Sequence, residues 1–388
     1  MSRGRKSLVL LTAVVLLVAL VVSAGCGGSK PTVYKIGVVI STSGPSAPLG
    51  QAQQRSLTLL EEQVNAAGGI NGSKLQFIIQ DDESAPAKAN TAVTSLITSE
   101  KVLAVIGAST SGSTLAMADT IERNQVPLIS CAAGEKITTP VKKYIFSVAP
   151  NDGLVSQRIL MYVRDTLKMN KIAVLNDANA YGTGGLAALQ QRAPAYKIQI
   201  VAAESYGSAD TDMTSQLTKI QQANPQALVV WGTNPGPASI AKNMQTLGMT
   251  LPFIGSSGIA NKSFITLAGP AANGVQFAAS KLLIPSSIPA GSAWAKSVNE
   301  FSTAYQKKYN MPIDPFAAHG WDAGNMIVNA IKSGATTSAN IRNQIEGLKS
   351  YPGVDGVFNY SPTNHAGLKV EAMFVVKIVN GQWTEATK

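Results

Sequence analysis

Short apolar runs rich in β-branched residues alternate with longer amphipathic stretches through most of the chain. An uninterrupted apolar run bounded by turn residues is typical of a buried strand, whereas apolar positions three or four residues apart predict a helix. In the first part of the chain this pattern predicts strands at 33–40, 75–80, 102–106 and 127–130, and helices at 51–67, 87–98 and 113–123. Apolar strands separated by helices indicate a parallel sheet that is covered on both faces.

The pattern starts again near residue 150, which indicates a second lobe. It predicts helices at 154–167, 184–192, 213–222 and 238–247, and strands at 171–175, 198–203, 227–231 and just before Gly255. Longer helices follow at 293–309 and 317–333, and the chain ends in strand-like runs at 354–360 and 370–379, which we expect to complete the sheets begun earlier. We therefore predict an α/β protein with two parallel-sheet lobes and a ligand cleft between their strand ends.

The N-terminus has the layout of a secretory signal peptide. Three basic residues precede an apolar run at 8–22, which is followed by small residues and Cys26. The run is shorter than the roughly 20 residues that a membrane-spanning helix needs, and a small-residue cleavage site follows it directly. We therefore expect residues 1–25 to be removed as a signal peptide.

The stretch before Cys26 resembles the lipobox of bacterial lipoproteins, in which the cysteine is acylated. The resemblance implies a mature chain that begins at a lipidated Cys26, with residues 26–33 as the lipidated cysteine and its tether. Lipoboxes usually carry Leu three residues before the cysteine, where this chain has Ser23, with Val22 one step earlier. A short transmembrane anchor, or ordinary cleavage near Ala24, is the alternative.

Composition narrows the classes of function. With 388 residues and 45% hydrophobic content, the chain is long enough for two domains of ordinary size. The formal net charge is +10, but the lysines are scattered and form no basic stripe, so we expect no nucleic-acid binding. If Cys26 is lipidated, Cys131 is the one remaining cysteine, and no intrachain disulfide can form.

Side chains suited to catalysis are scarce. The two histidines, His319 and His365, lie outside any motif. The sequence therefore offers few residues from which a Ser-His-Asp triad or a histidine metal cluster could be built. Asp81 and Asp82 are adjacent, so on a strand they would point to opposite faces and could not act as an acid–base pair. We therefore expect a binding protein without a cofactor or metal, with a hydrolase as the alternative.

The loop after the predicted strand 102–106 is rich in glycine and hydroxyl residues and leads into a helix. It reads GASTSGST from Gly107 to Thr114. Free backbone N–H groups, the positive end of the helix dipole and nearby hydroxyls together favour an anion such as a carboxylate. The alternative is that Ser113 merely caps its helix within an ordinary loop. Because the loop lacks the lysine of a GxxxxGK[ST] motif, we expect no nucleotide phosphate there.

A second loop, NDANAYGTG at 176–184, follows the predicted strand 171–175. Tyr181 in this loop could close over the apolar body of a ligand from the second lobe, and an ordinary surface tyrosine is the alternative. The glycines do not form a dinucleotide-binding fingerprint, because GxGxxG directly at the strand end is absent.

Several stretches, taken together and in order, resemble the leucine/isoleucine/valine-binding protein family, the type I periplasmic binding proteins. The matching text is KIGVVISTSGP (35–45), AGGINGSKL (67–75), the adjacent pair Asp81 and Asp82, VIGASTSGST (105–114), residues 176–182 and HGWDAGN (319–325). The similarity runs from about Tyr34 to Val379. It implies two doubly wound lobes joined by a three-crossover hinge, with 34–150 plus 281–373 as the N-terminal lobe and 151–280 plus 374–388 as the C-terminal lobe.

The resemblance also implies which residues of the first lobe contact the solute. In the family, the loop after the third strand binds the solute's carboxylate. That role maps onto Ser111, with Ser109 and Thr110 beside it. The end of the following strand contributes further hydrogen bonds and maps onto Ala132 and Gly134.

The second lobe supplies the opposite wall. The family's aromatic residue from this lobe maps onto Tyr181, and we expect Trp231, Asn234 and Ser257 to shape the far wall of the cleft. These residues, with the five of the first lobe, are the predicted ligand contacts.

Three positions depart from the family's pattern. Amino-acid binders commonly have Ser or Thr where Gly134 stands, an acidic partner for the ligand ammonium where Ser257 stands, and often Tyr where Asn234 stands. A buried ammonium without a nearby carboxylate is strongly disfavoured. The site then fits a carboxylate with an apolar or aromatic body and no α-amino group, unless Asp177 or Asp210 reaches the cleft.

The family resemblance implies an extracytoplasmic solute-binding lipoprotein of an ABC importer, capturing a small carboxylate of the branched-chain amino acid class. Its partners would be the membrane permease and ATPase subunits, and the lipid anchor would hold it at the cell membrane, on the periplasmic side or the cell surface. A ligand sensor read by a receptor rather than a permease is the alternative, because both roles use a two-lobed protein whose closed form is stabilised by ligand.

Overall fold

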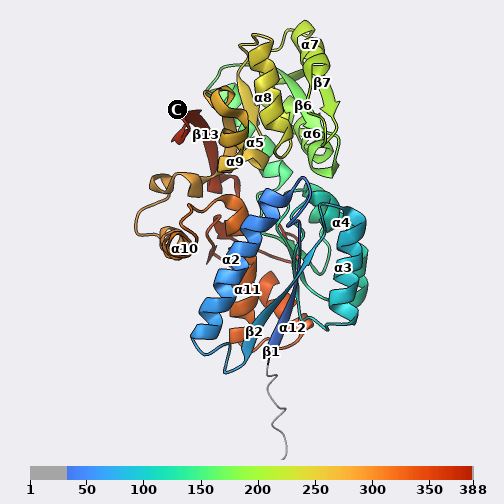
Figure 1. Cartoon of the computed structure of the whole chain (residues 1–388), viewed down its shortest axis with the longest axis vertical. Helices are drawn as coiled ribbons and strands as arrows, with labels where there is room; N and C mark the ends of the chain where they lie inside the picture. The colour runs from blue at the N-terminus through green and yellow to red at the C-terminus, as the bar shows by residue number, and fades with distance from the viewer. Residues whose placement is uncertain (1–32, 387–388) are drawn as a thin grey trace, which may run out of the picture. The chain divides into compact units, whose positions relative to one another are not determined.

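Two β-sheets organise the chain in the computed structural model, which describes residues 33–386 (Figure 1). The first sheet has five strands in the order β2-β1-β3-β4-β5, and β1, β3, β4 and β5 pair in parallel. Its strands are β1 (Val33–Ile40), β2 (Lys74–Asp81), β3 (Val105–Gly107), β4 (Leu128–Ser130) and β5 (Ile145–Ser147). We call the part of the chain packed around this sheet the first lobe.

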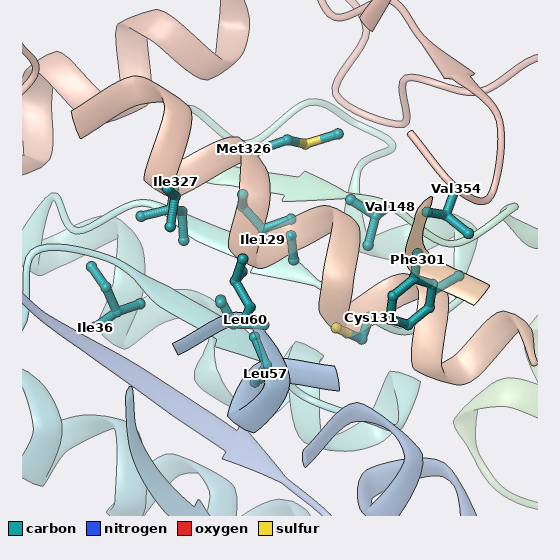
Figure 2. Packing of buried hydrophobic residues seen from close by; sticks show 14 of the residues in the cluster. Ile36, Leu57, Leu60, Ile129, Cys131, Val148, Phe301, Met326, Ile327 and Val354 are labelled. Atoms are coloured by element: carbon teal, nitrogen blue, oxygen red, sulfur yellow. The ribbon is translucent and has the colours of Figure 1, made fainter. Parts of the chain in front are cut away.

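Helices cover both faces of the first sheet because alternate side chains of its strands point to opposite faces. Ile36 and Val38 of β1 pack in one apolar cluster with α2 and α11, in which Figure 2 labels Ile36. Val39 packs in another cluster with α3 and α4. Both faces are therefore buried, as continuous apolar strands predict. The helices are α2 (Ala47–Ala66), α3 (Pro86–Thr98), α4 (Ser111–Asn124) and α11 (Pro315–Lys332).

The second sheet has seven strands in the order β14-β13-β10-β9-β8-β6-β7. Five of them pair in parallel, and β13 and β14 extend the sheet in antiparallel fashion at the β10 edge. The strands are β6 (Lys171–Asp177), β7 (Gln199–Tyr206), β8 (Ala227–Trp231), β9 (Phe253–Gly255), β10 (Gln276–Ser280), β13 (Met373–Val379) and β14 (Gln382–Glu385). We call the part packed around this sheet the second lobe.

The second sheet is also covered on both faces. One apolar cluster joins it to α5 and α6, and another joins it to α7, α8 and α9. These helices are α5 (Asp152–Asp165), α6 (Ala180–Arg192), α7 (Thr214–Gln222), α8 (Gly236–Thr246) and α9 (Lys262–Ala268). The prediction of an α/β protein with two doubly wound lobes is confirmed.

The later helices return to the first lobe. Trp294 and Phe301 of α10 (Ala293–Tyr309) and Ile341 of α12 (Ser338–Glu346) belong to the same apolar cluster as β1, α2 and α11. The chain thus passes between the lobes three times: after β5, after β10 and just before β13. Figure 2 shows how residues from these distant segments, such as Phe301 and Val354, meet around this core.

Two late segments differ from the prediction. The run at 354–360 does not complete an earlier sheet, because its strand β12 (Val357–Phe358) pairs with β11 (Tyr351–Pro352) in a small sheet of its own. Gly353 precedes this run, and Gly356, with φ near +158°, lies inside it, where a glycine weakens a strand. The run at 370–379 does join the second sheet, but only from Met373 onward.

The predicted signal peptide (1–25), the lipidated Cys26 and the tether lie outside the described residues, except that Val33, the last tether residue, begins β1. Within residues 33–386, no helix combines the length and the apolar character needed to span a membrane.

Candidate ligand-binding site

A cavity of about 340 Å³ lies where loops at the strand ends of the two sheets meet. Its walls come from the loops after β3, β4 and β5 in the first lobe, from the loops after β6, β7, β8 and β9 in the second, and from the starts of α2 and α11. Strand ends of parallel sheets are the usual place for ligands in α/β folds. Seven of the nine predicted contact residues line it: Ser109, Thr110, Ser111, Ala132, Tyr181, Asn234 and Ser257.

Three consecutive hydroxyl residues, Ser109, Thr110 and Ser111, lead into α4 and have different roles. The Ser109 hydroxyl donates a hydrogen bond to Gln53 Oε1 (2.6 Å) and accepts one from the Ser41 amide (3.0 Å). Thr110 is the helix N-cap, and its hydroxyl accepts a bond from the Ser113 amide. Of these three hydroxyls, only Ser111 Oγ is buried without a hydrogen-bond partner among the described residues. Ser111 is therefore the hydroxyl of the three that is free to bind a ligand.

The start of α4 adds backbone donors to this hydroxyl. Ser111 and Gly112 are the first two residues of the helix, so their N–H groups have no acceptor within it. Both residues line the cavity, and the helix dipole places partial positive charge at this end. One hydroxyl and two backbone amides at a helix N-terminus form a site suited to a carboxylate.

Gly134, one of the two predicted contacts that do not line the cavity, leaves room for Ser111. It precedes a short 3₁₀ turn (Glu135–Ile137), and a Cβ built on it would lie 2.9 Å from Ser111 Oγ. The expectation of a direct ligand contact at Gly134 is therefore not supported by the geometry. The absence of a side chain here instead keeps the Ser111 hydroxyl unobstructed.

Trp231 is the other predicted contact that does not line the cavity. It ends β8, is fully buried, and packs within the core of the second lobe against α6. Its ring centroid is 6.0 Å from that of Tyr181, which does line the cavity. Trp231 therefore supports the cavity wall from behind, because the period of two along β8 turns its side chain into the core.

Tyr181 is fixed by its own helix and by the loop after β9. Asn179 is the N-cap of α6, and its side chain accepts hydrogen bonds from the amides of Tyr181 and Gly182, each 3.0 Å long. The Tyr181 hydroxyl donates to Ser256 Oγ (3.1 Å) and lies 3.4 Å from Ser257 Oγ. Burial raises the pKa of this hydroxyl, so it stays protonated. Tyr181 thus presents a fixed ring to the cavity.

Asn234 and Ser257 complete the second-lobe wall. The Asn234 amide nitrogen donates to Ser263 Oγ (3.2 Å) and to Asn261 Oδ1 (3.4 Å), which orients the side chain. Its Oδ1 is buried and has no partner among residues 33–386. Asn234 therefore offers the cavity one hydrogen-bond acceptor.

Of the two acidic residues considered for the cleft, the structure brings one to the cavity. Asp177, the last residue of β6, lines the cavity and is 2% exposed. Burial raises the pKa of its carboxyl, and hydrogen bonds from Ser208 and Asn179 counteract part of that effect. Asp210 does not line the cavity, and its Oδ2 accepts a bond from the Gly207 amide (2.7 Å).

Apolar side chains on the first-lobe side of the cavity were not foreseen from the sequence. Leu49, Cys131 and Phe316 line it, and burial raises the pKa of the Cys131 thiol, so this side chain is neutral. His319 also lines it, with Nε2 3.3 Å from Oδ2 of the buried Asp355. The sequence did contain a signal for this part of the wall, since the HGWDAGN stretch at 319–325 resembled the family. No role in ligand binding was inferred for that stretch from the sequence.

The adjacent aspartates organise loops beside the cavity. Asp82 is fully buried and accepts hydrogen bonds from the Ser41 hydroxyl (2.6 Å) and the Ser84 amide (2.9 Å). Asp81 Oδ2 accepts a bond from the Ser43 hydroxyl (2.6 Å). The two carboxylates together hold the loop after β1 against the loop after β2. Over residues 33–386, no group of three or more His, Cys, Asp and Glu side chains is arranged to hold a metal ion.

Comparison with known proteins agrees with this architecture. A family model described as periplasmic binding protein matches residues 33–382. Over 242 residues the chain is 28% identical to the leucine-, isoleucine-, valine-, threonine-, and alanine-binding protein of Pseudomonas aeruginosa, an alignment that covers 62% of this chain and 65% of that protein.

Solved structures are similar over nearly the whole chain. An extracellular ligand-binding receptor from Rhodopseudomonas palustris HaA2 has a TM-score of 0.85 and 28% identity, covering 92% of this chain and 100% of that one. A branched-chain amino acid transporter substrate-binding protein from Streptococcus pneumoniae, solved in complex with isoleucine, has a TM-score of 0.81 and 29% identity, covering 90% and 97%.

The match to the family model spans almost all of the described chain, and the two-lobed fold and strand-end cavity accompany it. The resemblance found in the sequence is confirmed. The chain belongs to the periplasmic binding protein family.

Proposed function

We propose that this protein is the extracytoplasmic solute-binding component of an ABC importer and that it captures a small carboxylate solute of the branched-chain amino acid class. The observation that carries the proposal is the start of α4, where the Ser111 hydroxyl is buried without a partner among the described residues and lines the cavity. Buried polar groups are normally hydrogen-bonded, and a ligand carboxylate would satisfy this one.

The size of the cavity supports a small solute. Ligand pockets range from about 300 to 1,000 Å³, so a volume of about 340 Å³ lies at the lower end of that range. One amino acid or a short organic acid fits this space. The cavity also has no Lys or Arg among its described lining residues, so a multiply charged anion would lack counter-charges.

The remaining walls favour an apolar body on the solute. Leu49, Cys131 and Phe316 lie on the first-lobe side, and the Tyr181 ring lies on the second-lobe side. Burial of apolar surface contributes roughly 25 cal/mol per Å². A branched aliphatic or aromatic side chain would gain this stabilisation, and the carboxylate at Ser111 would fix its orientation.

A carboxylate without an α-amino group is the second candidate. Ser257 stands where the amino-acid binders of the family commonly carry an acidic partner for the ligand ammonium. The Ser257 hydroxyl lies 3.4 Å from the Tyr181 hydroxyl and brings no negative charge to the cavity.

The assembly proposed for this binding protein is that of its family. A ligand held by both lobes would stabilise their closed arrangement, which the permease and ATPase subunits recognise. The signal peptide and a lipidated Cys26 would place the protein outside the cytoplasm, anchored to the membrane by its acyl chains. A receptor-coupled sensor would use the same closed form.

A thermal-shift screen tests the proposal, because a ligand that binds only the folded state raises its apparent stability. The mature chain would be unfolded in the presence of leucine, isoleucine, valine, phenylalanine, their deaminated analogues and, as controls, the matching amines without a carboxylate. We expect carboxylates with an apolar body to raise Tm and the amines to leave it unchanged. A panel in which the amines stabilise as well as the carboxylates, or in which no carboxylate acts, contradicts the proposal.

A further inference from the structure

One ion pair joins the two lobes directly. Arg192 Nη2 of the second lobe donates a hydrogen bond to Glu135 Oε1 of the first lobe over 2.6 Å, and each of the two side chains is 26% exposed. Every other ion pair within residues 33–386 lies inside a single lobe. Hydrogen bonds between charged groups are stronger than neutral ones, so this pair is placed to influence how the lobes are held together.

The ion pair differs from the contacts at the passages of the chain between the lobes. The Ser280 hydroxyl, at the end of β10, donates to the Asp355 carbonyl (3.1 Å). The Arg158 guanidinium donates to the Val370 carbonyl (2.8 Å), just before β13. Each of these bonds involves a residue at a passage, where the backbone itself joins the lobes, whereas the ion pair connects elements that no passage joins.

Both partners of the pair are connected to the ligand cavity through the elements that carry them. Glu135 follows the loop after β4, and Ala132 and Ala133 of this loop line the cavity. Arg192 is the last residue of α6, and Tyr181, in the first turn of the same helix, lines the opposite wall. A rotation of one lobe against the other therefore moves the ion pair and the cavity walls together.

The lobes that the pair connects are closed on one another. The starts of α4 and α6 lie on opposite lobes, and a Cβ built on Gly112 of α4 would lie 3.8 Å from the Ala180 Cβ of α6. The gap between the two helix starts would therefore just admit a methyl group. Opening at this point moves α6 away from the first lobe, and it lengthens the contact between Arg192 and Glu135 because Ala180 and Arg192 are the two ends of one helix.

A glycine on α5 leaves the space that the pair occupies. A Cβ built on Gly153 would lie 2.6 Å from Arg192 Nη2 and 2.9 Å from Glu135 Oε1. Gly153 lies in the first turn of α5, although alanine favours a helix more than glycine does. The neighbouring Asp152 Oδ2 accepts a hydrogen bond from the Glu135 amide (3.2 Å), which holds the turn that carries Glu135. The second lobe thus provides both the room and the support for the pair.

We propose that Glu135 and Arg192 form an interlobe latch that stabilises the closed arrangement and makes closure of the cleft depend on ionic strength. This inference goes beyond the proposed function, because the latch acts on the lobes whichever solute they enclose. A partly exposed ion pair contributes little free energy, and salt screens its charges. We therefore expect the latch to raise the ratio of closed to open protein by about twofold to fivefold, which favours closure without trapping the solute.

Small-angle X-ray scattering of the ligand-free mature chain tests the latch without any solute. Glu135→Gln keeps the shape of the side chain and removes its charge. At about 0.01 M salt, where screening is weak, we expect Glu135→Gln to have a larger radius of gyration than the wild type, because its open form is more populated. At about 1 M salt, where charges are screened within about 3 Å, the wild-type radius should rise to that of the variant.

Glu204→Gln is the matched control. The Glu204 side chain is 25% exposed and pairs with Lys219 over 3.2 Å, but both residues belong to the second lobe, so the radius should equal that of the wild type. Gly153→Ala should enlarge the radius as Glu135→Gln does, because the new Cβ displaces the pair while both charges remain. Adding Arg192→Gln to Glu135→Gln should cause no further increase, since the pair is already broken. Circular dichroism and thermal unfolding would show that each variant is folded.

Three results would overturn the latch. The first is an equal radius of gyration for the wild type and Glu135→Gln at low salt. The second is an increase in Glu204→Gln as large as that in Glu135→Gln, because the loss of any negative charge would then suffice. The third is a Glu135→Gln radius that still exceeds the wild-type radius at high salt, which a screened ion pair does not explain. Each of these results leaves the proposed solute class intact, because the thermal-shift screen tests that class separately.

Discussion

Replacing Ser111 with alanine should weaken ligand binding while leaving the unliganded protein at least as stable. The Ser111 Oγ is buried, lines the cavity and has no hydrogen-bond partner among residues 33–386. An unsatisfied buried hydroxyl costs roughly 1–3 kcal/mol, so removing it does not sacrifice a contact in the free protein. The bound state, in contrast, would lose one hydrogen bond to a carboxylate.

The expected loss of affinity follows from the strength of that bond. A hydrogen bond to a charged group contributes roughly 1.5–3 kcal/mol, which corresponds to about a tenfold to 150-fold increase in Kd. The amides of Ser111 and Gly112 remain in the variant, so binding should be weakened rather than abolished. The assay is calorimetric titration with leucine and 4-methylpentanoate, together with thermal unfolding of the free protein.

Ser113→Ala is the matched control for this experiment. The Ser113 hydroxyl is also buried in the first turn of α4 without a partner among the described residues, but Ser113 does not line the cavity. We expect Ser113→Ala to keep wild-type affinity. Wild-type affinity in Ser111→Ala, or an equal loss in both variants, would refute the assignment of Ser111 as the carboxylate donor.

Three further predictions follow from contacts elsewhere. Gly185→Ala should destabilise the protein by about 2 kcal/mol or more, because the new Cβ would lie 2.1 Å from the Trp231 ring. Gly347→Ala, whose new Cβ would have contacts of 3.4 Å or longer, should leave the stability nearly unchanged. Urea unfolding measures both variants, and equal stability of the two would contradict the packing argument. Burial raises the pKa of Asp322 to about 7, so the folded state retains a proton that the unfolded state loses near pH 4. The free energy of unfolding should therefore fall as pH rises from 4 through 7, and it should fall less steeply in Asp322→Asn. If the free energy depended on pH in the same way in both proteins, Asp322 would not be the cause of that dependence. Cys26→Ser should move the protein from the membrane fraction to the soluble fraction on cell fractionation, and a variant that stays with the membrane would argue against lipid anchoring.

Local pattern was sufficient to predict most of the regular structure. The apolar run at 33–40 became β1 over the same residues, and the run at 227–231 became β8. Such runs are informative because a strand buried on both faces needs apolar side chains at every position. The run at 354–360 was wrongly expected to complete an earlier sheet, since its apolar residues fit a two-residue strand as well as a long one.

The proposed carboxylate site was also visible in the sequence, because its candidate donors come from one stretch at the start of α4. The sequence did not show which of its hydroxyl groups lacks a hydrogen-bond partner. The Ser109 hydroxyl is hydrogen-bonded to Gln53 and to the amide of Ser41, which are 56 and 68 positions away in the sequence. Only their approach in the folded first lobe leaves Ser111 as the free hydroxyl.

The opposite wall depended on tertiary structure even more strongly. The sequence by itself determined that an acidic residue, Asp177, follows an apolar strand and that Asp210 lies further along the chain. The tertiary structure decided that Asp177 reaches the cavity, that Asp210 does not, and that Trp231 packs behind Tyr181. The physical reason is that residue type and spacing fix which side chains can hydrogen-bond or carry charge, whereas packing between distant segments fixes which of those groups is left without a partner and faces a ligand.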